Sequence, residues 1–389
     1  MTLKDLQMIK ARLTVEYIRI LIMRIEGVGI LLACFLCCCS CNSTEDKRVA
    51  PKARKATTTL IKKTIATDDP KQLSDYSFFT GELKDLIPAD KVYPYAVNTP
   101  LFSNYAEKAR FIYLPQGKKI TFAQQGSFSF DKGAILIKNF FYHEIQGDTL
   151  SPRKIIETRL LIKEEEGWKP LNYIWNEQQT NANLNYVGKN VAVSWKDKKG
   201  EERQVNYVVP NLNQCKNCHN NNNKITPIGV TAAQLNRRYI ALQEKVNQLD
   251  AFKQAGILTN FSTAAAYSPM PVWDDALNFS VENRAKAYLD ANCAHCHSTQ
   301  GSAKNSGLYL SYHQKDRRKR GILKPPIAAG KGSGDFKYDI VPGHPEESIF
   351  IYRIGSNDPA IRMPEIGRSI VHQEGLALLT QYIKGLQKQ

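Results

Sequence analysis

The pentapeptide Cys-X-X-Cys-His occurs twice in this chain, at residues 215–219 and 293–297. Two thiols three positions apart lie about one helical turn from each other, so both can reach one edge of a porphyrin. The histidine that follows can turn under the macrocycle and offer a ring nitrogen to the iron. The pattern is the attachment motif of c-type haem. It predicts two covalently bound haem c groups, held by Cys215, Cys218, His219, Cys293, Cys296 and His297.

A zinc site and a redox dithiol are the alternative interpretations of such cysteine pairs. A four-cysteine zinc ribbon separates its pairs by about 15–20 residues. Here 74 residues lie between Cys218 and Cys293, although folding can still bring the pairs together. A dithiol leaves both trailing histidines unexplained. Covalent haem is therefore the favoured interpretation of both motifs.

The remaining cysteines lie near the N-terminus. The chain has nine cysteines, four of them in the two motifs and five in one short apolar stretch: Cys34, Cys37, Cys38, Cys39 and Cys41. No cysteine is left for a structural disulfide in the rest of the chain. Because stray thiols are a liability in an oxidising compartment, this distribution favours export.

The N-terminus agrees with export. An apolar run at residues 27–40 follows Arg24 and is too short for a confident membrane span. The run precedes a polar segment and resembles a bacterial lipoprotein signal, with Cys41 as the lipidated residue and Cys34 as the alternative. A plain signal anchor stays open, and Met23 is an alternative start. We expect a lipid-anchored protein of the bacterial cell envelope, facing the periplasm or attached to the outer membrane.

The net charge is +16, and one basic cluster lies at residues 315–320. The chain has no nucleic-acid-binding motif, and export argues against that partner. The cluster is interpreted as a solvated loop, with a docking surface for an acidic redox partner as the alternative, because electrostatic steering speeds such encounters.

Composition shifts along the chain predict an α+β multidomain protein, in which a β-rich N-terminal domain precedes two mainly α-helical c-type haem units. The expected parts are a leader (1–41), a polar basic tether (42–73), the β-rich domain (74–212), the first haem unit (213–275) and the second haem unit (276–389).

Alternating apolar and polar residues predict the strands of the β-rich domain. A more continuously apolar segment at residues 134–141 predicts a central strand. The other expected strands are 110–114, 119–122, 127–130, 159–163 paired with 168–175, and a hairpin of 191–195 with 204–209.

Helical periodicity predicts the elements of the haem units. Thr231 and Gln234 form a capping-box pair before a helix whose apolar stripe is Leu235, Tyr239, Leu242, Val246 and Leu249. Ser280 caps a helix that runs to Asn292 and delivers Cys293. A terminal helix carries the stripe Leu376, Leu379, Ile383 and Leu386.

The sixth iron ligands are the least constrained part of the site. Met363, followed by a proline before the terminal helix, is the expected distal ligand of the second haem, since His/Met ligation is common. Met270 is a tentative ligand of the first haem, with His143 or an open position as alternatives. The carbonyl of Pro227 is a candidate acceptor for the second ring nitrogen of His219.

The chain resembles class I c-type cytochromes over residues 280–389. The matching residues are 288–297, 341–345, Ser348, Arg353, 362–364 and the closing helix. From about residue 76 it resembles a family of bacterial dihaem c-type cytochromes with a β-rich N-terminal domain, on the segments 99–106, 157–161 and 173–176. This resemblance implies periplasmic electron transfer with a redox partner protein that the sequence does not identify.

Three functions compete. The leading hypothesis is an electron carrier rather than a catalyst, with two haems passing single electrons. The second is a dihaem peroxidase or oxidase, which needs one haem with an open sixth position. The third is a module that binds a surface polymer through Trp168, Trp175 and Trp195 and carries accessory haems, although core positions are the more common role of such residues.

Overall fold

The computed structural model describes residues 69–239, 246–327 and 330–387. The expected leader, most of the expected tether and both candidate lipidation cysteines, Cys41 and Cys34, lie outside these residues. Within the described ranges, no helix combines the length and the apolar character needed to cross a bilayer.

A six-stranded antiparallel sheet is the largest element. In spatial order its strands are β10 (Ala182–Leu184), β9 (Trp168–Trp175), β8 (Arg153–Lys163), β7 (Ile135–His143), β4 (Glu107–Tyr113) and β3 (Val92–Tyr95). The apolar segment at 134–141 forms the central strand β7, as predicted. The predicted pairing of 159–163 with 168–175 is also confirmed, with Lys163 opposite Trp168.

One face of the sheet is covered by the segment that precedes β3. This segment contains η1 (Leu73–Tyr76), β1 (Phe79–Thr80), η2 (Leu83–Asp85) and β2 (Ile87–Pro88). Its aromatic residues pack against Ile137, Leu160 and Leu171, each at most 1% exposed. Burial of large apolar side chains here closes this side of the sheet.

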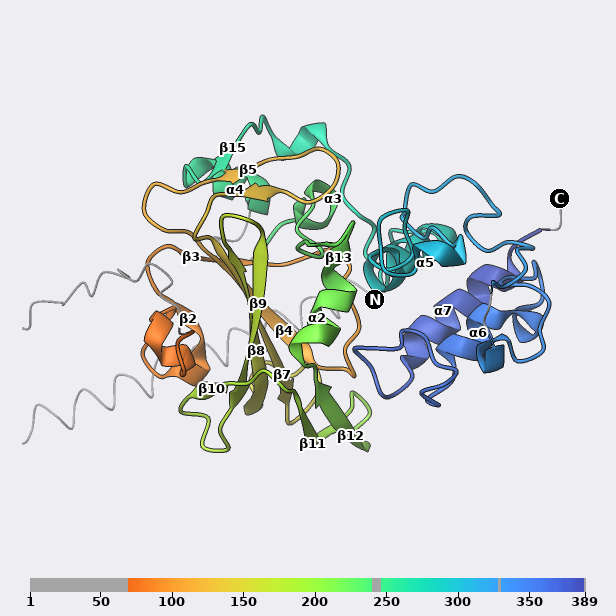
Figure 1. Ribbon diagram of the computed structural model, residues 1–389, viewed down its shortest axis with the longest axis horizontal. Helices are drawn as coiled ribbons and strands as arrows, with labels where there is room; N and C mark the ends of the chain where they lie inside the picture. The colour runs from red at the N-terminus through yellow and green to blue at the C-terminus, as the bar shows by residue number, and fades with distance from the viewer. Residues whose placement is uncertain (1–68, 240–245, 328–329, 388–389) are drawn as a thin grey trace, which may run out of the picture. The chain divides into compact units, whose positions relative to one another are not determined.

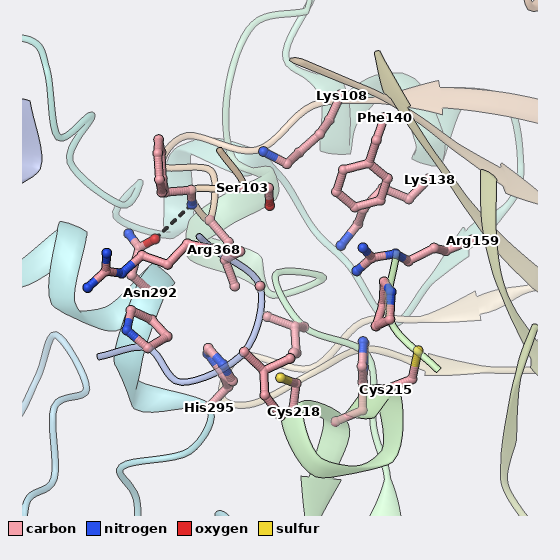
Figure 2. A pocket seen from close by; sticks show the side chains of 18 of the residues that line it. Ser103, Lys108, Lys138, Phe140, Arg159, Cys215, Cys218, Asn292, His295 and Arg368 are labelled. Carbon is pink, nitrogen blue, oxygen red and sulfur yellow. Dashed lines mark hydrogen bonds between the residues drawn. The ribbon is translucent and has the colours of Figure 1, made fainter. Parts of the chain in front are cut away.

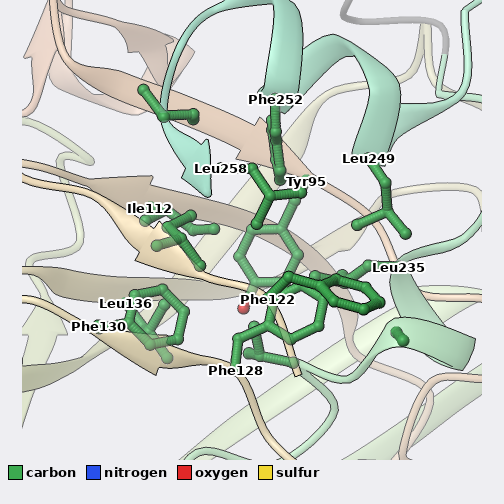
Figure 3. Packing of buried hydrophobic residues seen from close by; sticks show 14 of the residues in the cluster. Tyr95, Ile112, Phe122, Phe128, Phe130, Leu136, Leu235, Leu249, Phe252 and Leu258 are labelled. Atoms are coloured by element: carbon green, nitrogen blue, oxygen red, sulfur yellow. The ribbon is translucent and has the colours of Figure 1, made fainter. Parts of the chain in front are cut away.

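Part of the other face packs against residues from both sides of the first motif (Figure 3). Ile112 and Leu136 of the sheet belong to one hydrophobic cluster with Leu249, Phe252 and neighbouring residues. The elements here are β5 (Ile120–Thr121), β6 (Ser129–Phe130), α3 (Ala232–Leu235), α4 (Gln248–Gln254), β15 (Leu258–Thr259) and η4 (Ala264–Ala266). Strand β15 pairs in parallel with β5, so the segment after the first motif shares a sheet and a core with the segment before it.

A hairpin of β11 (Lys189–Lys196) and β12 (Glu202–Val209) packs on the other end of the same face. Its register confirms the predicted hairpin, with Val191 opposite Tyr207. Trp195 is 5% exposed and contacts Tyr142 of the sheet.

The C-terminal region has its own core, in which α5 (Val281–Leu289) packs against α7 (Gln373–Lys384) (Figure 1). The two helices approach closely at Gly375, where an added Cβ would lie 2.3 Å from the hydroxyl of Tyr288. Helix α6 (Ile349–Ile354) joins this core. The remaining short elements are β13 (Asn220–Asn221), β14 (Lys224–Ile225), η5 (Asp290–Ala294), η6 (Lys304–Ser306), η7 (Gly330–Ser333) and η8 (Pro345–Glu347).

The predicted fold class is wrong in its helical part. The structure is β-rich, 26% strand and 23% helical, rather than a β domain followed by two mainly α-helical haem units. Only four of its described helices have seven or more residues: α2 (Leu212–His219), α4, α5 and α7.

The predicted helix on the Leu235–Leu249 stripe shows the physical reason. Helix α3 ends at Leu235, and the side chain of Asn236 then donates to the carbonyl of Ala264 instead of continuing the helix. A separate helix, α4, starts after its cap Asn247. Leu235 and Leu249 are both buried, but they belong to different helices packed on the sheet. Leu242 lies outside the described residues.

Candidate haem-binding site

The first motif forms the last part of α2, which lies beside the sheet (Figure 1). Asn211 starts this helix with a capping box. Its side chain accepts from the amide of Gln214 at 2.9 Å, and the side chain of Gln214 accepts from the amide of Asn211 at 3.0 Å. Asn172 of β9 contacts the sulfur of Cys215 at 3.8 Å and donates to the carbonyl of Pro210 at 2.6 Å. The central sheet therefore positions the first motif.

The second motif follows α5 directly. Ser280 caps this helix as predicted, and the chain continues through the π-helical turn η5 into Cys293. The amide of His297 donates to the carbonyl of Cys293 at 2.8 Å. Gly301 packs on the motif so closely that a Cβ there would lie 2.2 Å from the carbonyl oxygen of Cys296. Only glycine allows this approach of the two backbone segments.

Each motif histidine is held through Nδ1. Nδ1 of His219 lies 2.7 Å from the carbonyl of Thr226, so it must carry the hydrogen. The predicted acceptor, Pro227, is wrong by one residue. Nδ1 of His297 lies 3.1 Å from the hydroxyl of Ser306, which itself donates to the carbonyl of Ala303 and therefore accepts from the imidazole.

This arrangement leaves Nε2 of both histidines available to a metal. No hydrogen bond to either Nε2 occurs within the described part of the chain. Burial lowers the pKa of His219 to about 3 and that of His297 to about 4, so both rings are neutral at physiological pH. A neutral imidazole with its Nδ1 hydrogen engaged is the form in which histidine binds iron or zinc.

The fold brings the two motifs together. Cys218 and Cys296 line the same cavity, and the neighbouring Cys296 thiol is the main cause of the raised pKa of the Cys218 thiol. However, the four cysteines do not gather into one tetrahedral set. Among the residues that the structure describes, the only three or more potential metal-ligand atoms within 4.8 Å of one another belong to the half-exposed or exposed His344, Glu346 and Glu347. The geometry therefore disfavours a four-cysteine zinc site. The four thiols are also free rather than paired in disulfides.

Two cavities adjoin the motifs. The second cavity, of about 600 Å³, is lined by Cys296 and His297 and by apolar side chains such as Leu310 and Phe350. This volume lies within the range of about 300–1,000 Å³ that ligand pockets occupy. Its thiols, neutral imidazole and apolar walls fit a haem.

The first cavity is lined by Cys215, Cys218 and His219 on one side and by the central sheet on the other. Its volume is about 170 Å³, smaller than a porphyrin requires. The long side chains of Lys108, Lys138 and Arg159 extend into it and take up space (Figure 2). The residue types fit a haem, but these side chains leave too little room for the macrocycle, so binding at this site would require them to move.

The candidate distal ligands lie in different places. Met363 lines both cavities, and its carbonyl accepts from Nε of Arg368 at 3.0 Å. Met270 is 6% exposed and lines neither of these cavities; its amide donates to the carbonyl of Ala233. His143 also lies away from both and is paired through Nδ1 with Glu107 at 2.8 Å.

Two cavity histidines were missed by sequence reasoning. His295, an internal residue of the second motif, lines both cavities, and its buried Nδ1 has no partner among the described residues. His372 lines the first cavity and lies 2.9 Å from the hydroxyl of Tyr288. The motif position of His295 was the available signal, whereas nothing in the sequence marked His372.

A row of cations on the sheet was also missed. Arg110, Lys138 and Arg159 lie directly opposite one another on β4, β7 and β8, and Arg159 lies opposite Asn172. All four line the first cavity. Burial, assisted by the neighbouring arginines, lowers the pKa of Lys138 to about 7.

The tryptophans proposed as stacking residues are mostly core residues. Trp175 is 7% exposed and donates through its ring nitrogen to the hydroxyl of Thr158. Trp195 is 5% exposed, and Trp168 packs edge-on against Phe130. No stacking platform for a polymer is formed by these three rings.

Comparison of this chain with protein family models, with curated proteins and with solved structures finds no match. The resemblance to dihaem c-type cytochromes therefore rests on the sequence motifs.

Proposed function

We propose that this protein is an exported dihaem c-type cytochrome that transfers single electrons. One observation carries the proposal: two Cys-X-X-Cys-His motifs lie next to each other, and each presents a neutral imidazole with Nδ1 already hydrogen-bonded. A redox dithiol does not require the ordered histidines, and a four-cysteine zinc site requires four converging sulfurs.

The chain's own residues have distinct tasks in this proposal. Cys215, Cys218, Cys293 and Cys296 form the thioether links, and His219 and His297 bind the two irons. Thr226 and Ser306 fix the orientation and tautomer of these histidines. Bound haem supplies a one-electron couple whose potential depends on the axial ligands and the surroundings.

Met363 is the proposed distal ligand of the second haem. It lines the cavity of His297, and Arg368 and Arg353 hold its backbone, with its amide donating to the carbonyl of Arg353 at 3.1 Å. A methionine thioether favours reduced iron and raises the potential.

A peroxidase or oxidase activity is the second candidate function. The observation that favours it is that Met270 lines neither cavity, so the first cavity shares its one lining methionine, Met363, with the second. An open or displaceable sixth position is what such catalysis requires.

The physiological partner is proposed to be another redox protein, with the lipidated Cys41, or alternatively Cys34, anchoring the chain to a membrane of the cell envelope. The basic cluster at residues 315–320 is a candidate docking surface, although Arg320 within it is 13% exposed and faces Glu282 rather than solvent.

Spectroscopy of protein matured in a host with a cytochrome c maturation system separates the two functions. We expect a low-spin spectrum for both haems, full reversible reduction, and no change on adding cyanide or peroxide. Rapid binding of cyanide at one haem, with turnover of peroxide, would instead identify the enzyme.

A further inference from the structure

The cation row crosses the wall of the first cavity from the attachment cysteines outward. Asn172 contacts Cys215, and Arg159, Lys138 and Arg110 follow on successive strands. Neighbouring strands are about 4.8 Å apart, so Lys138 lies about 10 Å and Arg110 about 14 Å along the sheet from Asn172. Figure 2 shows Lys108 and Lys138 across the cavity from Cys215 and Cys218.

Lys108 extends this group on the same face, two positions from Arg110. Its Nζ donates to the carbonyl of Ala106 at 3.0 Å. Lys108, Lys138 and Arg159 all lie within 6 Å of the ring of Phe140. Three cations therefore surround one buried aromatic ring.

Of this group, only Arg159 is paired with a protein carboxylate in the described part of the chain. Glu157 is fully buried and pairs with Arg159 at 2.5 Å, while Tyr207 donates to it at 2.6 Å. No carboxylate lies within 4.0 Å of Lys108, Arg110 or Lys138 in the described ranges. Glu107, the nearest acidic neighbour in sequence, is paired with His143.

Positive charges outnumber negative charges in the lining of the first cavity. It includes one carboxylate, Glu365, and six cations: Lys108, Arg110, Lys138, Arg159, Arg362 and Arg368. Like charges directly opposite on a sheet oppose folding, and buried cations are retained where an anion satisfies them. An anionic ligand would balance the positive charge of this lining.

We propose that the row formed by Lys108, Arg110, Lys138 and Arg159 binds the carboxylate groups of the first haem. This inference rests on the proposed function. A haem linked through its vinyl edge to Cys215 and Cys218 has its two carboxylates at the opposite edge, and the row extends across the cavity from those cysteines. Arginine and lysine form charge-assisted hydrogen bonds with carboxylates. The central sheet is thereby part of the first haem pocket.

The test is a redox titration of the full-length dihaem protein carrying Lys138→Met, which removes the charge and keeps a side chain of similar length. We expect the potential of one haem to fall, because a carboxylate left without its cation stabilises ferric iron, while the other haem is unchanged. Lys138→Arg should restore the wild-type potential. Lys154→Met removes an exposed lysine from β8 and should change neither potential.

Lys108→Met is a second variant that tests the same row if Lys138→Met does not fold, with the same expected fall. Unchanged potentials in protein that carries two haems, or an equal shift in Lys154→Met, would overturn the inference while leaving the proposed function intact. A wild-type chain without haem would overturn the proposed function and this inference with it.

A second experiment asks whether the row binds the haem carboxylates or a dissolved anion. Succinate or citrate added to the wild-type protein should leave both potentials and the spectrum unchanged, because the row is already occupied. A saturable shift that Lys138→Met abolishes would show a row open to dissolved carboxylates and would overturn the assignment.

Discussion

The backbone amide of Asn222 donates a hydrogen bond of 2.9 Å to the carbonyl of Gln300. Each residue follows its motif histidine by three positions, so this bond joins the two loops that leave the motifs. Cys218 and Cys296, one from each motif, also line the same cavity. Two haems attached at these cysteines would lie at their closest along the edges that carry the thioether links.

This adjacency predicts magnetic coupling of the two haems. We expect the electron paramagnetic resonance spectrum of fully oxidised protein to differ from the sum of two isolated haem signals. Reducing one haem should then change the signal of the haem that stays oxidised. Two independent, additive signals at every stage of a redox titration would contradict the close approach of the motifs.

Met363 provides a test of the distal ligand. Met363→Ala should remove the charge-transfer band between methionine sulfur and ferric iron, and Met363→His should lower the potential of that haem, because imidazole favours ferric iron more than a thioether does. Met270→Leu is the matched control and should leave the band unaltered, since Met270 lines neither cavity. A band that survives in Met363→Ala would refute the assignment.

Gly375 tests the packing of the C-terminal region. A Cβ at this position would lie 2.3 Å from the hydroxyl of Tyr288, so Gly375→Ala must push α5 and α7 apart. Overpacking of this kind costs about 1–3 kcal/mol of unfolding free energy, measurable by chemical denaturation. Gly385→Ala at the end of the same helix is the control, because its Cβ would meet no atom nearer than 3.6 Å. Equal stability of the two variants would contradict the close helix contact.

We expect the folded protein to lose stability in acid because His372 is buried. Burial lowers its pKa to about 4, although Glu374 opposes this shift. The unfolded chain, with a histidine pKa of about 6.5, binds the proton more tightly. The contribution of His372 to the free energy of unfolding is therefore fully present above about pH 6.5. It is lost as the pH drops toward 4, by up to about 3 kcal/mol.

Replacing His372 with glutamine should flatten this part of the pH profile. Glutamine keeps a polar group near Tyr288 but has no charge to gain. The free energy of unfolding of His372→Gln should change less between pH 6.5 and pH 4.5 than that of the wild-type protein. Parallel profiles would show that another group governs the acid response.

Local patterns in the sequence predicted local features well. The continuously apolar segment at residues 134–141 predicted a strand. Ser280 and the terminal stripe predicted α5 and α7. These features depend on neighbours within one or two turns or strands, which the sequence displays directly.

Features that depend on strand register or distant packing were not predictable in the same way. Arg110, Lys138 and Arg159 are separated by 28 and 21 positions, and only the pairing of β4, β7 and β8 places them in one row. Leu235 and Leu249 have helical spacing, but the sheet buries them on two short helices. The acceptor for His219 was missed by one residue because a turn decides which carbonyl faces the ring.

The most direct measurement of the central claim is the number of haems per chain. Protein from a maturation-competent host should give a reduced-pyridine spectrum and an intact mass that both correspond to two covalently attached haems. The pairs Cys215→Ser with Cys218→Ser and Cys293→Ser with Cys296→Ser should each leave one. A colourless protein whose mass includes no tetrapyrrole would contradict the account.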